Sequence, residues 1–133
     1  MPHLQFEINK KVKSEQKLLF IKFVEKKFSE IMQTGIDHIA VTIRELERQS
    51  ISLGRANNNE DICLMNLDIR SGRSSEQRIK LVRDLISGVE SFFEIKKSNQ
   101  YVTITTHLGE EFNFFERSLD DWTKNDDPAK GKS

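Results

Sequence analysis

Pro2 is the residue near the start of the chain with the most distinctive chemistry. Removal of Met1, which is usual before a small residue such as proline, would leave a secondary amine at the chain terminus. A terminal amino group titrates near about 7.7 to 8.0, and both desolvation and neighbouring cations lower its pKa. An amine with a lowered pKa suits general base catalysis. Pro2 is therefore a candidate base, although proline occurs at roughly one position in twenty, so its surroundings must decide.

Arg70 and Arg73 form a second group of residues with a chemistry of their own. They border the turn Ser71-Gly72, between a predicted strand and a helix whose free N–H groups favour anions. A guanidinium binds a carboxylate through paired hydrogen bonds and polarises a conjugated acid as charge develops on it. The pair therefore indicates a site for a carboxylate substrate. The alternative is that both arginines are solvated or satisfy acidic neighbours.

The elements that would position these residues belong to an internal repeat. At an offset of 61 residues, Ser14-Glu15-Gln16 falls on Ser75-Glu76-Gln77, and Val41-Thr42-Ile43 falls on Val102-Thr103-Ile104. One offset shared without a gap indicates two copies of one structural unit. Cys63 takes in the second copy the place that Pro2 has in the first. We expect Cys63 to be a buried strand residue and not a nucleophile.

Each copy carries the pattern of a strand, a helix and a second strand. Alternating apolar residues predict the first strand, helical spacing predicts the helix, and the Val-Thr-Ile run predicts the second strand. The apolar residues that carry these patterns are Leu4, Phe6, Ile8, Leu18, Ile21, Val24, Phe28 and Ile31 in the first copy, and Cys63, Met65, Leu67, Ile69, Ile79, Val82, Leu85, Val89 and Phe92 in the second. Ser74 and Gln77 have the spacing of a capping box, which predicts that the second helix begins at Ser74 or Ser75.

The predicted fold class is α/β. Two tandem β-α-β repeats, residues 2–54 and 62–115, would form one four-stranded sheet with both helices on one face. A single domain would span residues 1–123, with a polar connector at residues 52–60 and a mobile polar tail at residues 124–133. Helices on one face leave the other face bare. We expect that face to be apolar and to be covered by further copies of the chain.

The composition argues against several classes of function. The 133 residues include 21 Lys plus Arg and 21 Asp plus Glu, so a net charge of zero gives no reason to expect nucleic acid or an anionic membrane as a partner. Cys63 is the single cysteine, and His3, His38 and His107 show no ligand spacing, so we expect no metal site. No apolar run approaches the roughly 20 residues of a membrane span, and the start lacks the pattern of a secretory signal. We therefore expect a soluble cytoplasmic protein.

The opening Met1-Pro2-His3, the segment from Ser71 to Arg78 and the doubled β-α-β pattern resemble the tautomerase superfamily. From about Cys63 to Phe114, the second copy is similar without gaps to 4-oxalocrotonate tautomerase. The resemblance implies that Pro2 is the general base, that Arg73 binds the substrate carboxylate and that Phe112 lines the pocket beside the proline. It also implies a homotrimer of two-repeat chains and chemistry that needs no cofactor.

Two branches of the superfamily share features with this chain. The Met-Pro-His start and the Gly-Arg-Ser-x-Glu-x-Arg run are similar to 5-carboxymethyl-2-hydroxymuconate isomerase, which moves a proton across a conjugated acid. Arg70 is similar to an arginine of the cis-3-chloroacrylic acid dehalogenase branch, whose turn supplies two carboxylate-binding arginines. That branch also uses a histidine, which would fall near Phe28 to Glu30 where this chain has none, a tyrosine, which would fall near Thr103, and a glutamate. The candidates for that glutamate are Glu110, Glu111 and Glu116.

The sequence therefore predicts an isomerase that acts on a small unsaturated keto or enol carboxylic acid, with Pro2 as base and with Arg70, Arg73 and Phe112 at the substrate. Two alternatives stay open. One is hydration or dehalogenation of a haloacrylic-type acid. The other is an interaction protein without turnover, as relatives of macrophage migration inhibitory factor show is possible for this architecture. Further cations that could reach a neighbouring subunit's pocket are Arg44, Arg48 and Arg55.

Overall fold

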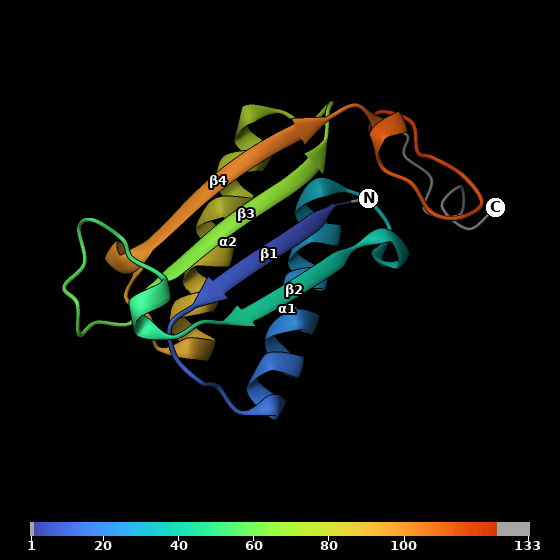
Figure 1. The fold of residues 1–133 in the computed structure, drawn as a ribbon. Coiled ribbons are helices and arrows are strands. Elements are labelled where there is room, and N and C mark those ends of the chain that lie inside the picture. Colours follow the sequence, from blue (N-terminus) through green and yellow to red (C-terminus); the bar gives the residue numbers. More distant parts are fainter. Residues whose placement is uncertain (1, 125–133) are drawn as a thin grey trace.

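A computed structural model, which describes residues 2–124, shows four strands in one sheet with two helices packed on it (Figure 1). The predicted mobile tail, residues 124–133, lies outside the described residues except for Lys124. The helices and strands are β1 (His3–Ile8), α1 (Ser14–Met32), β2 (Ala40–Glu45), β3 (Cys63–Arg70), α2 (Ser75–Phe93) and β4 (Gln100–His107). Four short 3₁₀ turns, η1 (Ile36–His38), η2 (Arg48–Ser50), η3 (Lys97–Asn99) and η4 (Gly109–Glu111), connect them or follow β4.

The strand order is β2-β1-β3-β4. Within each repeat the two strands are parallel, because the helix between them carries the chain back across the sheet. The two repeats meet through an antiparallel pairing of β1 with β3. Both helices lie on the same face, behind the sheet in Figure 1. The predicted α/β fold of two β-α-β repeats with one helix-covered face is confirmed.

The two repeats follow each other residue by residue at the offset of 61. Each end of α2 lies 61 residues after the corresponding end of α1. Both helices end at a left-handed residue, Gln33 with φ 51° and Glu94 with φ 56°, and a 3₁₀ turn of three residues follows at the same spacing in each repeat. The capping box is also confirmed, since the Ser74 side chain accepts from the Gln77 backbone N–H while the Gln77 side chain accepts from Ser74.

The buried stripe of each helix agrees with the predicted one at its middle, Val24 and Phe28 in α1 and Leu85 and Val89 in α2, and differs at its ends. Leu18 and Ile79 were expected to face the core, but they are 61% and 51% exposed. A straight run at intervals of four residues is buried instead, because both helices lie along the sheet and present one ridge to it. These ridges are Phe20, Val24, Phe28 and Met32 in α1 and Leu81, Leu85, Val89 and Phe93 in α2, again 61 residues apart.

Gly88 allows the two helices to approach each other closely. A Cβ atom at position 88 would lie 2.2 Å from the Phe23 ring of α1, far inside van der Waals contact. The Phe23 ring in turn lies 5.4 Å from Phe92 and 6.2 Å from Phe20, so it has neighbours that resist its displacement. The absence of a side chain at position 88 is therefore a packing requirement of the helix layer.

Gly88→Ala should lower the free energy of unfolding by about 1–3 kcal/mol through overpacking, despite the better helix propensity of alanine. The matched control is Gly54→Ala in the connector, where a new Cβ would meet nothing within 4 Å. Urea titration followed by circular dichroism measures both variants. Equal stability of Gly88→Ala and the parent chain would contradict the close helix contact.

The uncovered face of the sheet is polar, which corrects the expectation of an apolar face. Alternation along each strand sends the apolar residues toward the helices and leaves Gln5, Asn66, Asp68 and Thr103 on the other side. The Asp68 carboxylate accepts from the amides of Gln5 at 3.3 Å and Asn66 at 3.2 Å, and lies 3.4 Å from the ring of His107. A partner that covers this face must therefore meet hydrogen-bonding groups.

Candidate active site

The pairing of β1 with β3 brings the start of the chain to the arginine turn. His3 lies opposite Asp68 in this antiparallel ladder, so the next residues outward are Pro2 on one strand and Ile69 on the other, with Arg70 ending β3. Pro2 is buried, and its carbonyl oxygen accepts a hydrogen bond of 3.0 Å from the Ala40 N–H. Pro2, directly before β1, and the turn before α2 therefore share one edge of the sheet.

Arg70 points into the protein and not into solvent. It is 6% exposed. Its Nη1 donates to the carbonyl oxygen of Asp120 at 2.8 Å, and its Nη2 lies 3.4 Å from the hydroxyl of Thr34. The guanidinium thus lies between the loop that follows α1 and the segment that follows β4.

Arg73 is equally buried, at 7% exposure. Its Nε and Nη2 donate to the carbonyl oxygen of Met32 at 3.4 and 3.3 Å. The guanidinium carbon lies 4.8 Å from the centre of the Trp122 ring and 5.8 Å from that of Phe28. Both guanidiniums are therefore buried and not solvated, whereas the alternative that they satisfy acidic neighbours stays open.

The segment Leu119–Trp122, which we call the strap, covers this turn. The Trp122 N–H donates to the Ser71 carbonyl at 3.1 Å, and its indole Nε1 donates to the Gln33 carbonyl at 3.0 Å. Gly72, with φ 123°, makes room for the strap, since a Cβ there would lie 2.3 Å from the Trp122 carbonyl oxygen. Sequence reasoning missed the strap; the one tryptophan of the chain, beyond the last predicted strand, was the available signal.

Gly109 makes the same kind of room at the root of the strap. A Cβ at position 109 would lie 2.0 Å from the Asp120 carbonyl carbon. The Gly109 N–H donates to the Asp121 carboxylate at 2.6 Å. Glycines in two different turns therefore leave the space that lets the strap lie against the sheet edge.

Phe112 lies at the same sheet edge, because β4 runs parallel to β3 and ends beside Arg70. Its side chain is half-buried, and its ring meets the His107 ring edge to face at 5.6 Å. Its carbonyl accepts from the Leu119 N–H at 3.1 Å. Phe112 thus binds the first residue of the strap through its backbone, whereas its role as a wall beside Pro2 stays a prediction.

The three candidate glutamates are all exposed. Glu111 is the one with a described bond, since its carboxylate accepts from the Leu108 N–H at 3.0 Å and caps the turn η4. Glu110 follows Gly109 in the same turn, and Glu116 lies on the excursion between Asn113 and Ser118. Their carboxylates are therefore close to the strap in sequence, but this arrangement does not single out one of them as a water-activating group.

The additional arginines do not approach Pro2 of their own chain. Arg44 lies near the far end of β2, where it pairs with Glu7 at 3.6 Å. Arg48 follows β2 and pairs with Asp61. Arg55 is exposed in the connector. Their predicted role at the pocket of a neighbouring subunit stays a prediction.

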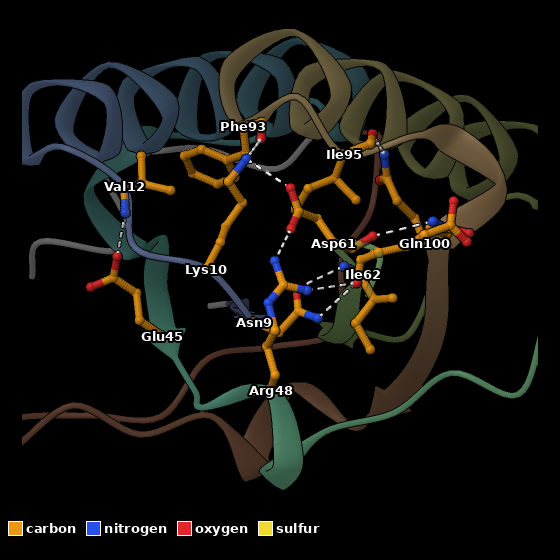
Figure 2. Close-up of polar contacts among 12 residues, drawn as sticks. Asn9, Lys10, Val12, Glu45, Arg48, Asp61, Ile62, Phe93, Ile95 and Gln100 are labelled. Carbon is orange, nitrogen blue, oxygen red and sulfur yellow. Dashed lines mark hydrogen bonds and ion pairs between the residues drawn. The ribbon is translucent and has the colours of Figure 1, made fainter. Parts of the chain in front are cut away.

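The opposite end of the sheet holds the repeat counterpart of the arginine turn (Figure 2). At the offset of 61 residues, Asn9 corresponds to Arg70 and Val12 to Arg73. Asn9 is 6% exposed, and its amide binds the connector by accepting from Ile62 N–H at 2.8 Å and donating to the Glu60 carbonyl at 3.0 Å. The counterpart turn thus lacks the two guanidiniums, and its Asn9 side chain binds the backbone of Glu60 and Ile62.

Asp61 is the centre of the charged network at this end. Its carboxylate lies 3.0 Å from Lys10 Nζ and 2.5 Å from Arg48 Nη2 (Figure 2). Burial raises the pKa of Asp61, but the hydrogen bonds from Lys10 and Arg48 outweigh it and hold the pKa below its usual range. The network lies beside a cavity of about 460 Å³. Asn9, Arg48 and residues of the connector line this cavity.

Asp61→Asn should therefore destabilise the fold in a pH-dependent way. A depressed folded-state pKa contributes stability that is present above the unfolded value near about 3.9 and is lost as pH falls through the lower folded value. We expect a lower melting temperature for the variant at pH 7 and a difference that closes as the pH falls below the unfolded-state pKa and through the lower folded-state pKa. Asp84→Asn is the control, since Asp84 pairs with Lys80 and Lys27 on the helix surface at 3.3 and 4.0 Å. A difference that persists unchanged at low pH would contradict the role of the charge.

Cys63, the counterpart of Pro2, is fully buried in the core. Desolvation, with a smaller contribution from the charge of Glu7, raises the pKa of its thiol to about 12. The expectation that Cys63 is a buried strand residue is confirmed, and the raised pKa argues against a nucleophilic role for its thiol.

The native protein should accordingly leave Cys63 unmodified by dithionitrobenzoate at pH 7 to 8, because the thiolate is both scarce and shielded. One thiol per chain should react after unfolding in guanidinium chloride, which serves as the control. Rapid labelling of the native protein would show that the start of β3 opens.

His3 projects to the polar face, where its Nε2 lies 2.8 Å from the Thr42 hydroxyl, on the side of the sheet away from the buried Pro2 face. Within residues 2–124, the His, Cys, Asp and Glu side chains form no group of three or more that could hold a metal ion. In the same range, neither helix combines the length and apolar character needed to cross a bilayer.

Comparisons with solved structures identify the fold. Macrophage migration inhibitory factor of Toxoplasma gondii is similar at a TM-score of 0.76 and 15% identity, over 88% of this chain and 99% of that chain. A member of the cis-3-chloroacrylic acid dehalogenase family is similar at 0.78 and 17%, over 98% and 87%. Native fused 4-OT is similar at 0.73 and 17%, over 87% and 94%. No family model and no curated protein matches the chain.

FG41 malonate semialdehyde decarboxylase is also similar, at a TM-score of 0.71 and 11% identity, over 84% of this chain and 87% of that chain. These neighbours share the fold of the tautomerase superfamily. This chain has that fold, as the sequence resemblance predicted. At identities of 11 to 17%, the likeness defines the architecture and not the reaction.

Proposed function

We propose that the protein is a cofactor-independent tautomerase, an isomerase that acts on a small unsaturated keto or enol carboxylic acid. Pro2, freed by removal of Met1, is the general base. Arg70 and Arg73 bind the substrate carboxylate, and Phe112 contributes to the wall of the pocket. The proposal rests on one observation above the others, which is the burial of two guanidiniums at the sheet edge where β1 begins.

The chemistry follows from the two kinds of group. The Pro2 nitrogen takes a proton from the enol hydroxyl or an acidic carbon of the substrate, and the electron pair of that bond moves into the conjugated system. The resulting ammonium returns the proton at another position of that system, so no electrons are gained or lost. The guanidiniums neutralise the carboxylate and stabilise negative charge that spreads through the conjugated acid. The same positive charges favour the unprotonated amine.

Assembly into a homotrimer is part of this proposal. One neighbour of the same fold is described as an asymmetric trimer of fused 4-OT chains. The polar sheet face, with Asp68, Asn66 and Gln5 already joined by hydrogen bonds, offers a surface that a second copy could cover without leaving polar groups unpaired. The substrate would then lie between Pro2 of one chain and side chains of the next.

The two alternatives have weaker support. Hydration or dehalogenation needs a glutamate that activates water, and Glu110, Glu111 and Glu116 are all exposed. An interaction protein without turnover needs no base, so it leaves the position of Pro2 beside the buried Arg70 and Arg73 without a use. Assay of phenylenolpyruvate beside a cis-haloacrylate separates the three possibilities, because a tautomerase consumes the first, a dehalogenase the second, and a binding protein neither.

Blocking the amine should abolish turnover. We expect intact mass to show loss of Met1, and we expect an amino-terminal extension, which converts the Pro2 amine to an amide, to lower kcat/KM for phenylenolpyruvate by about 10²–10⁴-fold. His3→Gln is the control, since its side chain projects to the other sheet face and the Pro2 amine stays free. Full activity of the extended protein would exclude Pro2 as the base.

A further inference from the structure

Trp122 joins three parts of the arginine site. Its backbone N–H binds Ser71 in the arginine turn, its indole N–H binds Gln33 at the end of α1, and its carbonyl oxygen fills the space above Gly72. The side chain is 6% exposed. These contacts fix both the backbone and the ring of Trp122, so the indole is a rigid surface within the site.

The rigid surface faces Arg73. The guanidinium carbon lies 4.8 Å from the centre of the indole ring, with the Phe28 ring 5.8 Å away. A guanidinium is planar and weakly hydrated, so an aromatic face attracts it and sets the plane in which its N–H groups point. The hydrogen bonds from Arg73 to the Met32 carbonyl are long, at 3.3 and 3.4 Å. They are weaker than the short, paired bonds that the same fork makes to a carboxylate.

We propose that Trp122 is a positioning residue that holds the Arg73 guanidinium in the plane required to bind the substrate carboxylate. The inference rests on the proposed function, since it assigns Arg73 to that carboxylate. On binding, the carboxylate takes the N–H groups that now meet the Met32 carbonyl, and the indole keeps the fork in place during the exchange. The strap is thus part of the ligand site and not only a cover over it.

A binding experiment tests the inference without turnover. Trp122 is the single tryptophan of the chain, so its fluorescence reports on this position alone. Sorbate, a conjugated carboxylate, should change the emission in a saturable way, whereas the corresponding uncharged amide should not at the same concentrations. In Arg73→Lys, which keeps the charge but lacks the planar fork, saturation should require about tenfold more sorbate. Emission that does not respond to sorbate would overturn the inference.

A kinetic experiment separates positioning from a merely structural role. Trp122→Leu should raise KM for phenylenolpyruvate about tenfold with kcat changed less than threefold, because the aromatic contact acts on carboxylate binding. Trp122→Phe keeps an aromatic face and should recover most of that loss, although it lacks the indole N–H. Phe92→Leu is the control for a lost aromatic contact in the helix layer, where Phe92 lies 5.4 Å from Phe23. It should leave KM unchanged.

The outcomes distinguish the inference from the proposed function. If turnover is absent but sorbate saturates the Trp122 signal and Arg73→Lys weakens it, the binding role stands and the tautomerase proposal fails. If turnover depends on the Pro2 amine but Trp122→Leu keeps the parent KM, the positioning role fails and the proposed function stands. If Trp122→Leu does not fold, Trp122→Phe and the fluorescence titration still decide.

Discussion

The antiparallel pairing of β1 with β3 is the constraint on which the rest of the structure depends. It joins two β-α-β units into one sheet, and it does so in a register that sets His3 against Asp68. A consequence of that register is that Pro2 lies at the edge where β3 ends and α2 begins. A shift of one residue would turn the apolar side chains of β1 to the polar face, so the core and the proposed site share one determinant.

The repeat makes the molecule nearly symmetric in backbone and asymmetric in chemistry. Both ends of the sheet have a strand, a turn and a helix start at matching positions, but one turn carries Arg70 and the other carries Asn9. Arg70 and Asn9 are about equally buried, at 6% each. The guanidinium binds the carbonyl of Asp120 and the amide binds the connector, so each end is closed by a different segment of the chain. The charge difference between the ends is what assigns the proposed site to one of them.

Much of the fold was predictable because its signals are local and occur twice. Alternation in β1 and β3, the capping box at Ser74 and the shared offset fix the elements and their order. The exposed Leu18 and Ile79 show the limit of helical spacing, since several apolar stripes fit one sequence and only packing against the sheet selects among them. The polar character of the other sheet face was not predicted, because the prediction used the apolar residues of each strand and not the polar residues between them.

The candidate site was predictable in its parts but not in its closure. Arg70 and Arg73 stand out by residue type and by their place before a helix, but their burial depends on contacts with Met32 and Asp120, which lie 41 and 50 residues away in the chain. No local pattern announces the strap, since the sequence after β4 has neither helical nor strand periodicity. Long-range hydrogen bonds to carbonyl groups, such as that of the Trp122 indole to Gln33, leave no signature in residue type.

The arginine site is composed of the first residues of the chain, a turn at its middle and the strap near residue 120. During synthesis the ribosome releases these parts in that order, so Arg73 can reach the Met32 carbonyl and the Phe28 ring before Asp120 and Trp122 have been released. The hydrogen bond from Arg70 to Asp120 and the contact of Arg73 with the Trp122 ring form only when Leu119–Trp122 has been released. The contacts between the strap and the two arginines are therefore among the last to form as the chain folds.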